Sequence, residues 1–145
     1  MSGPATLAEH LAAARARLQR LEPAAAAIAT TRGAVLVDIR SSDQRRRDGV
    51  VDGAIWYPRN VLEWRAAPDA ELRDPAFRDA PSLVLMCAEG FQSSLAAATL
   101  LDLGVAGATD VVDGFAGWRA AGLPVRPFDE ARDLLQGSPG APRRS

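Results

Sequence analysis

The residue with the clearest chemical setting is Cys87. It follows the apolar run Leu83–Met86, and a short loop containing Gly90 leads to a helix predicted to begin at about Ser93. Backbone N–H groups in such a strand–loop–helix turn can converge on one point, and the helix N-terminus adds positive potential. This setting stabilises a thiolate, the nucleophilic form of cysteine, and would equally stabilise a persulfide anion. The alternative is that Cys87 is a small buried hydrophobic side chain.

Two arginines are candidates for binding an anionic substrate. Arg59 and Arg65 follow the strand candidate Ala54–Tyr57, and sites in parallel α/β sheets form beyond the carboxyl ends of strands. The alternative is that both are solvated charges, or pair with Glu63 or Asp69.

Other polar residues favour structural roles. Asp38 and Arg40 end the β-branched run Val35–Ile39, and they fit a structural ion pair or turn better than a catalytic pair. The single histidine, His10, belongs to a predicted N-terminal helix far from Cys87 in sequence. A Cys–His nucleophile pair therefore lacks support.

Strand and helix patterns alternate along the chain. A capping box at Thr6 and Glu9 starts a helix predicted over about 7–22. Further helices are predicted at 23–31, 60–65, 94–103 and 115–121, with a turn and short helix within 40–48 and strands at 35–39, 54–57, 83–86 and 109–112. The alternation favours a parallel α/β sheet with helices on both faces.

Composition excludes several classes of protein. The chain has 145 residues, 48% of them hydrophobic, and a net charge of −1, which fits one globular domain without sequence-independent nucleic-acid binding. One cysteine and one histidine cannot supply the roughly four ligands of a zinc site. A free thiol suits a reducing cytoplasm. No apolar run approaches the roughly 18 residues of a membrane span, and no signal-peptide pattern starts the chain.

Four motifs together resemble the rhodanese (thiosulfate sulfurtransferase) family. They occur in the family's order and spacing and cover about residues 23–126. They are Val35–Arg40, similar to the strand ending in Asp-x-Arg; Gly49–Ala54, similar to Gly-His-Ile-Pro-Gly-Ala; Cys87–Ser93, similar to Cys-x-x-Gly-x-x-Ser; and Asp113–Trp118 with Ala121–Val125, similar to Gly-Gly-Phe-x-x-Trp and Gly-Leu-Pro-Val. The stretch Arg59–Arg65 resembles a short single-domain bacterial subgroup.

The resemblance implies a three-layer α/β/α fold with a mainly parallel sheet of about five strands. On this basis we expect an N-terminal helical extension at 1–22, the rhodanese-like domain at 23–128 and a disordered tail at 129–145.

The resemblance also implies a sulfurtransferase. Cys87 would take a sulfane sulfur from a small-molecule or protein donor such as thiosulfate and pass it to a thiol or cyanide. No cofactor, metal, nucleic acid or membrane is expected, and the sequence leaves the oligomeric state open. The implied site is Cys87 with the loop amides of Ala88, Glu89, Gly90, Phe91, Gln92 and Ser93.

This chain departs from the family pattern within the loop. Many members carry arginine beside the cysteine or the serine, whereas this chain has Ala88 and Gln92 there. Glu89 adds a negative charge, which disfavours a thiolate unless it points to solvent. Val50 replaces the usual histidine, and we interpret that change as structural.

Two other functions are weighed against sulfur transfer. One is a non-catalytic sulfur-carrier or regulatory module on the same fold, which the altered loop would suit. The other is a cysteine phosphatase or arsenate reductase, which needs an arginine six positions after the cysteine to clamp an oxyanion. Ser93 occupies that position.

Overall fold

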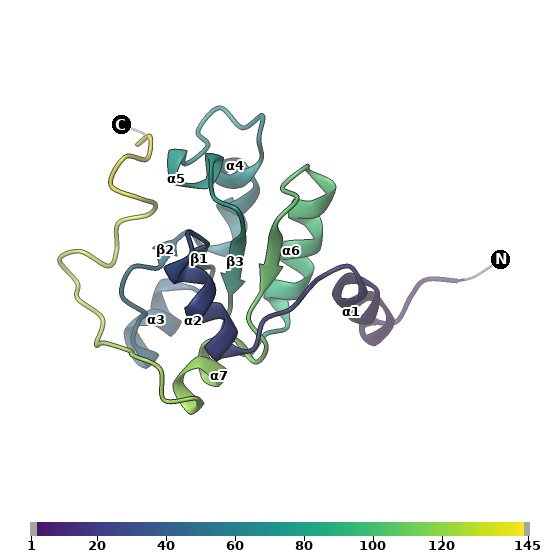
Figure 1. Ribbon diagram of the computed structural model, residues 1–145, viewed down its shortest axis with the longest axis horizontal. Helices are drawn as coiled ribbons and strands as arrows, with labels where there is room; N and C mark the ends of the chain where they lie inside the picture. The colour runs from purple at the N-terminus through teal and green to yellow at the C-terminus, as the bar shows by residue number, and fades with distance from the viewer. Residues whose placement is uncertain (1–2, 144–145) are drawn as a thin grey trace.

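A computed structural model of the chain describes residues 3–143. Within them, a four-stranded parallel sheet has the order β2-β1-β3-β4 and is covered by helices on both faces (Figure 1). In chain order the elements are α1 (Leu7–Ala16), α2 (Pro23–Thr31), β1 (Val35–Asp38), α3 (Ser42–Asp48), β2 (Ile55–Trp56), the 3-10 turn η1 (Arg59–Val61), α4 (Leu62–Ala66), α5 (Pro75–Arg78), β3 (Leu83–Met86), α6 (Gln92–Asp102), β4 (Ala108–Asp110) and α7 (Gly114–Ala120).

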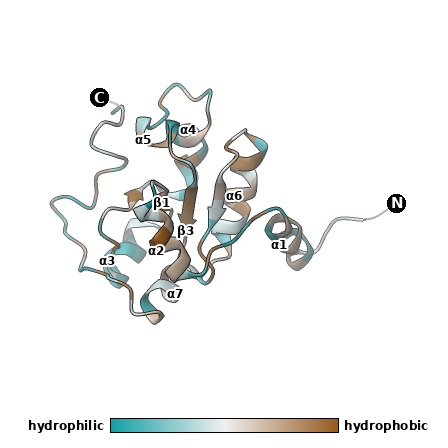
Figure 2. Ribbon diagram, in the orientation of Figure 1, coloured by the Kyte–Doolittle hydropathy of each residue, from teal (hydrophilic) through white to brown (hydrophobic). Residues whose placement is uncertain are grey.

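Strand β3 lies in the middle of the sheet, paired with β1 on one side and β4 on the other. All four of its residues are buried and apolar, and the strand is brown in Figure 2. Such a continuous apolar run is expected where both faces of a parallel strand are covered. The carboxyl end of β3, where Cys87 follows, therefore has a neighbouring strand on each side and an apolar layer on each face.

Side chains alternate between two apolar layers, one on each face of the sheet. Leu83, Leu85 and Cys87 lie in the layer that α4, α5 and α6 cover. Val84 and Met86 lie in the opposite layer, under α2 and α7. This arrangement confirms the predicted three-layer α/β/α fold, and the period of two places Cys87 on the α6 side.

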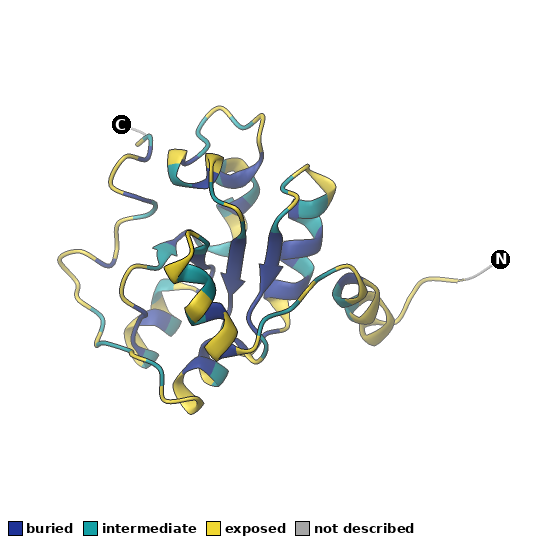
Figure 3. Cartoon of the chain, in the orientation of Figure 1, coloured by how far each residue is buried: buried dark blue, intermediate teal, exposed yellow. Residues whose placement is uncertain are grey.

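The N-terminal helix is shorter than the 7–22 predicted, because α1 ends at Ala16. The chain beyond it is extended beside β4: the N–H of Leu21 donates to Asp110 O at 3.0 Å, and the N–H of Val112 donates to Leu21 O at 2.8 Å. Leu21 thereby forms a parallel bridge with Val111 and satisfies the edge of the sheet. Helix α1 packs mainly against α6, and most of its surface is exposed (Figure 3).

The C-terminal segment is packed, although its composition predicts disorder. Residues 129–143 run along the side of the molecule opposite α1 (Figure 1). Ser138 donates to the buried Asp74 through both its N–H and its hydroxyl, and the N–H of Gly137 donates to Trp56 O. These long-range polar contacts help to hold the segment, so hydropathy alone does not reveal its order. Between residues 3 and 143, no helix is both long and apolar enough to cross a bilayer.

Candidate active site

Cys87 lies between the carboxyl end of β3 and the first turn of α6, in a loop that we call the Cys87 loop (Cys87–Ser93). Its side chain is 5% exposed. Two backbone N–H groups donate to its Sγ atom, from Gly90 at 3.1 Å and from Ser93 at 3.3 Å. The sulfur thus borders the apolar layer but is not sealed in hydrocarbon, because main-chain donors reach it.

Helix α7 braces the Cys87 loop from the other side. The N–H of Phe115 donates to Cys87 O at 2.8 Å, and that of Ala116 donates to Ala88 O at 3.0 Å. Gly114 comes so close that a Cβ atom there would lie 2.4 Å from Cys87 O. The carbonyls of Cys87 and Ala88 therefore point toward α7, and the amides of Gly90 and Ser93 face the sulfur.

A hydroxyl and a buried carboxylate extend the polar contacts of the sulfur. Ser93 Oγ accepts from the Cys87 thiol at 3.3 Å and donates to Asp110 Oδ2 at 2.7 Å. Ser94 Oγ also donates to Asp110 Oδ2, at 2.8 Å. Asp110 ends β4 and is fully buried. Its carboxylate is therefore linked to Cys87 through a single serine hydroxyl.

Two arginines from the N-terminal segment reach the same place. Arg15 and Arg20 both donate to Gly90 O, at 2.7 and 3.1 Å. Arg20 also forms a two-point ion pair with Asp110, at 2.8 and 3.3 Å. The Cys87 loop lacks arginine in its own sequence, so these contacts bring positive charge to it from outside.

None of the other four side chains in the loop is fully buried with the sulfur. Glu89, Phe91 and Gln92 are exposed, and Ala88 is partly buried. The charge of Glu89 is therefore screened by water and weighs little against an anionic sulfur.

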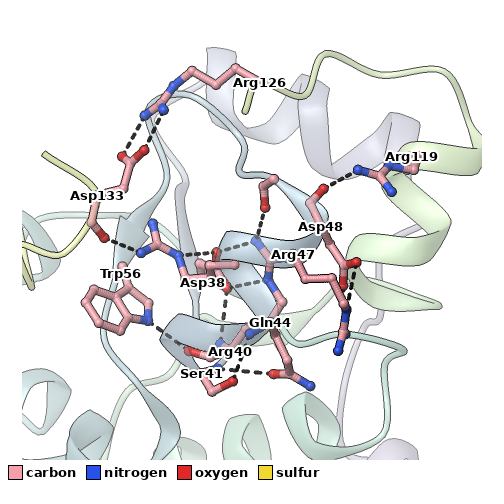
Figure 4. Close-up of polar contacts among 12 residues, drawn as sticks. Asp38, Arg40, Ser41, Gln44, Arg47, Asp48, Trp56, Arg119, Arg126 and Asp133 are labelled. Carbon is pink, nitrogen blue, oxygen red and sulfur yellow. Dashed lines mark hydrogen bonds and ion pairs between the residues drawn. The ribbon is translucent and has the colours of Figure 1, made fainter. Parts of the chain in front are cut away.

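Asp38 and Arg40 form a buried structural network (Figure 4). Arg40 donates to both carboxylate oxygens of Asp38, at 3.0 and 2.8 Å, and to Gly49 O. Arg45 donates to Asp38 as well and contacts the C-terminal segment at Asp133 O. Through Arg45, this network joins β1 to α3 and to the C-terminal segment.

Arg59 and Arg65 are differently placed from each other. The N–H of Arg59 donates to Ile39 O, which locates Arg59 at the carboxyl edge of the sheet, but its guanidinium pairs with Glu63 at 2.7 Å. Arg65 donates to Pro142 O at 3.0 Å. In residues 3–143, no hydrogen bond joins either side chain to the Cys87 loop.

A well-formed cavity lies away from this site. It measures about 450 Å³ and is lined by α2, the start of β1, Val51–Ile55 and Trp118, with no residue of the Cys87 loop. Among the described residues, no three His, Cys, Asp or Glu side chains come together as a metal site.

Sequence reasoning missed Asp110, Arg15 and Arg20. Asp110 had a signal, since it ends the strand next to β3 in a parallel sheet, where polar side chains gather. Arg15 and Arg20 had none, because the packing of α1 on α6 and the pairing of Leu21 beside β4 bring them to the Cys87 loop from far away in the chain.

Residues 22–121 match the Rhodanese-like domain family, and the chain belongs to this family. A protein of unknown function from Rhodopseudomonas palustris, described as "Possible Tyrosine Phosphatase", has a similar structure: TM-score 0.77 and 30% identity, covering 87% of this chain and 98% of its own. No curated protein sequence matches the chain.

Two sulfurtransferases share the fold at lower identity. A thiosulfate sulfurtransferase from Pseudomonas aeruginosa has a TM-score of 0.60 and 21% identity, over 85% of this chain and 24% of its own. A human single-domain sulfurtransferase has a TM-score of 0.55 and 21% identity, over 70% of this chain and 95% of its own.

Proposed function

We propose that this protein is a sulfurtransferase that carries sulfur as a persulfide on Cys87. The thiolate attacks the outer sulfur of a donor such as thiosulfate, a new S–S bond forms, and the S–S bond of the donor breaks. Sulfite leaves with the bonding electron pair. A thiol or cyanide then attacks the outer sulfur of the persulfide, and the Cys87 thiolate leaves.

The observation that supports this function most is the pair of amides on the sulfur. The N–H groups of Gly90 and Ser93 lie 3.1 and 3.3 Å from Sγ. Donors at this distance stabilise negative charge on the sulfur without needing to reorganise during the reaction. We expect the loop N–H groups from Ala88 to Ser93 to hold the outer sulfur in the same way.

The partners that suit this chemistry are a sulfane-sulfur donor, small or protein-bound, and a thiol acceptor. The cysteine sulfur is the nucleophile that accepts the transferred sulfur atom, so the proposal needs no cofactor. A single free thiol that must stay reduced between turnovers suits the cytoplasm.

A second candidate is a sulfur carrier or regulatory module without useful turnover. The low exposure of Cys87, at 5%, and the absence of arginine in its loop favour this candidate. A phosphatase is less well supported, because Ser93 stands six positions after Cys87, where an arginine would clamp the oxyanion.

A thiosulfate:cyanide assay on the wild type and on Cys87→Ala tests the function. We expect thiocyanate to form with the wild type and to be lost in the variant. Equal rates in the two proteins would refute catalysis by Cys87. A persulfide on Cys87 without thiocyanate formation would instead identify a carrier.

A further inference from the structure

The N-terminal segment holds the Cys87 loop at its central peptide. The carbonyl oxygen of Gly90 accepts from Nη2 of Arg15 at 2.7 Å and from Nη2 of Arg20 at 3.1 Å. The N–H of the same residue donates to Cys87 Sγ. Two guanidinium groups therefore fix the residue whose amide contacts the sulfur. Arg15 and Arg20 both lie outside residues 22–121, the part that matches the family.

Asp110 is an obstacle to an anionic sulfur at position 87. Its buried carboxylate accepts from Ser93 Oγ, which itself lies 3.3 Å from Sγ. A buried negative charge that is separated from the sulfur by one hydroxyl group disfavours a thiolate or a persulfide anion. Asp110 also competes with the anionic sulfur for the single hydroxyl proton of Ser93.

Arg20 removes much of this obstacle. It pairs with both carboxylate oxygens of Asp110, and its side chain is only 17% exposed while that of Asp110 is fully buried. The pair neutralises the carboxylate and weakens it as an acceptor. The Ser93 hydroxyl, which donates to Asp110 while Cys87 is a thiol, can therefore turn more readily toward an anionic sulfur. Arg15 adds a second cation, which donates to Ser94 Oγ at 3.1 Å.

The backbone around Arg20 is held firmly enough for this role. Hydrogen bonds from Leu21 to Asp110 and from Val112 to Leu21 tie the segment to β4, and the Thr109 hydroxyl donates to Gln19 O. Helix α1 is held on α6 by the separate pair of Arg17 with Asp102.

Other charged groups near Cys87 are exposed or already paired. They are the exposed Glu89 and Asp113, the pair Asp38–Arg40 and the pair Arg59–Glu63. Arg15, Arg20 and Asp110 are the charged groups bonded directly into the Cys87 loop among the described residues.

We propose that Arg15 and Arg20 are positioning residues that supply, from the N-terminal segment, the positive charge that the Cys87 loop lacks. They hold Gly90 in place, and Arg20 neutralises Asp110, which favours the anionic form of Cys87 as the nucleophile. The proposal deepens the sulfurtransferase function and rests on it for its biological role.

The test is the rate of iodoacetamide alkylation as a function of pH. Cys87 is the single cysteine of the chain, so the rate reports on it alone and needs no sulfur donor. In Arg20→Gln, the unpaired carboxylate should move the midpoint of the pH curve up by about one unit, which is about tenfold slower alkylation below the midpoint. In Arg20→Gln/Asp110→Asn, the midpoint should return toward that of the wild type.

Two variants separate charge from folding. Arg20→Lys keeps the charge and should stay near the wild-type midpoint. Arg17→Gln breaks the exposed pair with Asp102 at the end of α6, away from the loop, and should leave the curve unchanged. If Arg20→Gln does not fold, Arg15→Gln should still show a smaller upward shift.

An unchanged midpoint in folded Arg20→Gln, or an equal shift in Arg17→Gln, would overturn the proposal. Failure of Cys87 to accept sulfur from any donor would refute the sulfurtransferase function instead, and the alkylation result would stand apart from it.

Discussion

The N–H of Gly90 lies 3.1 Å from Cys87 Sγ, and this contact requires a backbone that only glycine adopts easily. Gly90 has a φ of +87°, and a Cβ atom there would lie 2.8 Å from the backbone nitrogen of Asp113. The loop geometry and the position of the α7 N-terminus are therefore coupled through this one residue.

Gly90→Ala should destabilise the protein and lose most of its Cys87-dependent activity. We expect a loss of about 2–4 kcal/mol, from the left-handed backbone and the clash with Asp113 together. The matched control is Gly53→Ala: Gly53 has a φ of +85° but nothing within 4 Å of its Cβ position. Its cost should be only about 1 kcal/mol, with activity retained. Equal losses of stability and activity in the two variants, measured by denaturant unfolding and sulfur transfer, would contradict the account.

Thiosulfate should be a poor donor. The Cys87 loop presents no arginine of its own, and Arg15 and Arg20 are occupied by Gly90 and Asp110, so a dianion meets little free positive charge. We expect weak saturation with thiosulfate and stronger saturation with a persulfide donor. Steady-state kinetics with both donors check this, and a thiosulfate KM in the low micromolar range would refute it.

Arg59 is the candidate for binding an anionic donor, and its pairing with Glu63 makes the idea testable. Arg59→Gln should raise the donor KM several-fold with little change in kcat. Glu63→Gln frees the Arg59 guanidinium and should lower the donor KM. Arg65→Gln serves as the comparison, since Arg65 contacts the C-terminal segment. Identical saturation curves for all three variants and the wild type would remove Arg59 from the site.

The C-terminal segment should contribute stability that disappears in acid. Hydrogen bonds from Arg126 lower the pKa of Asp133 from 3.8 to about 2. A depressed carboxyl pKa stabilises the folded state fully above the unfolded value, and this stabilisation is lost as the pH falls through the folded value. Asp133→Asn should therefore cost about 1–2 kcal/mol at pH 7, because Arg126 is partly solvated.

Unfolding of the wild type and Asp133→Asn across pH measures this effect. The difference between the two should shrink between about pH 4 and pH 2. A difference that is independent of pH would show that Asp133 acts through packing alone.

Most of the fold could be predicted from local patterns. The apolar run Leu83–Met86 forms β3, because burial on both faces leaves its mark in the local sequence. Glycines near helix ends mark those ends, because they meet a local backbone requirement. The end of α1 and the order of residues 129–143 could not be predicted. Both depend on hydrogen bonds to β4, Asp74 and Trp56, which lie far away in the chain.

The candidate site divides in the same way. Cys87 and the loop glycine are local features, and sequence reasoning placed them together. Arg15 and Arg20 contact Gly90 across 75 and 70 residues, and nothing in their own surroundings distinguishes them from the other arginines. The sequence thus showed that the loop lacks an arginine, but it did not show that Arg15 and Arg20 supply positive charge there.

Mass spectrometry of intact protein incubated with a sulfane-sulfur donor tests the central claim most directly. We predict that Cys87 gains the mass of one sulfur atom and loses it again when a thiol or cyanide is added, with no gain in Cys87→Ala. Absence of the added sulfur with every donor, in protein whose Cys87 still alkylates, would contradict the account.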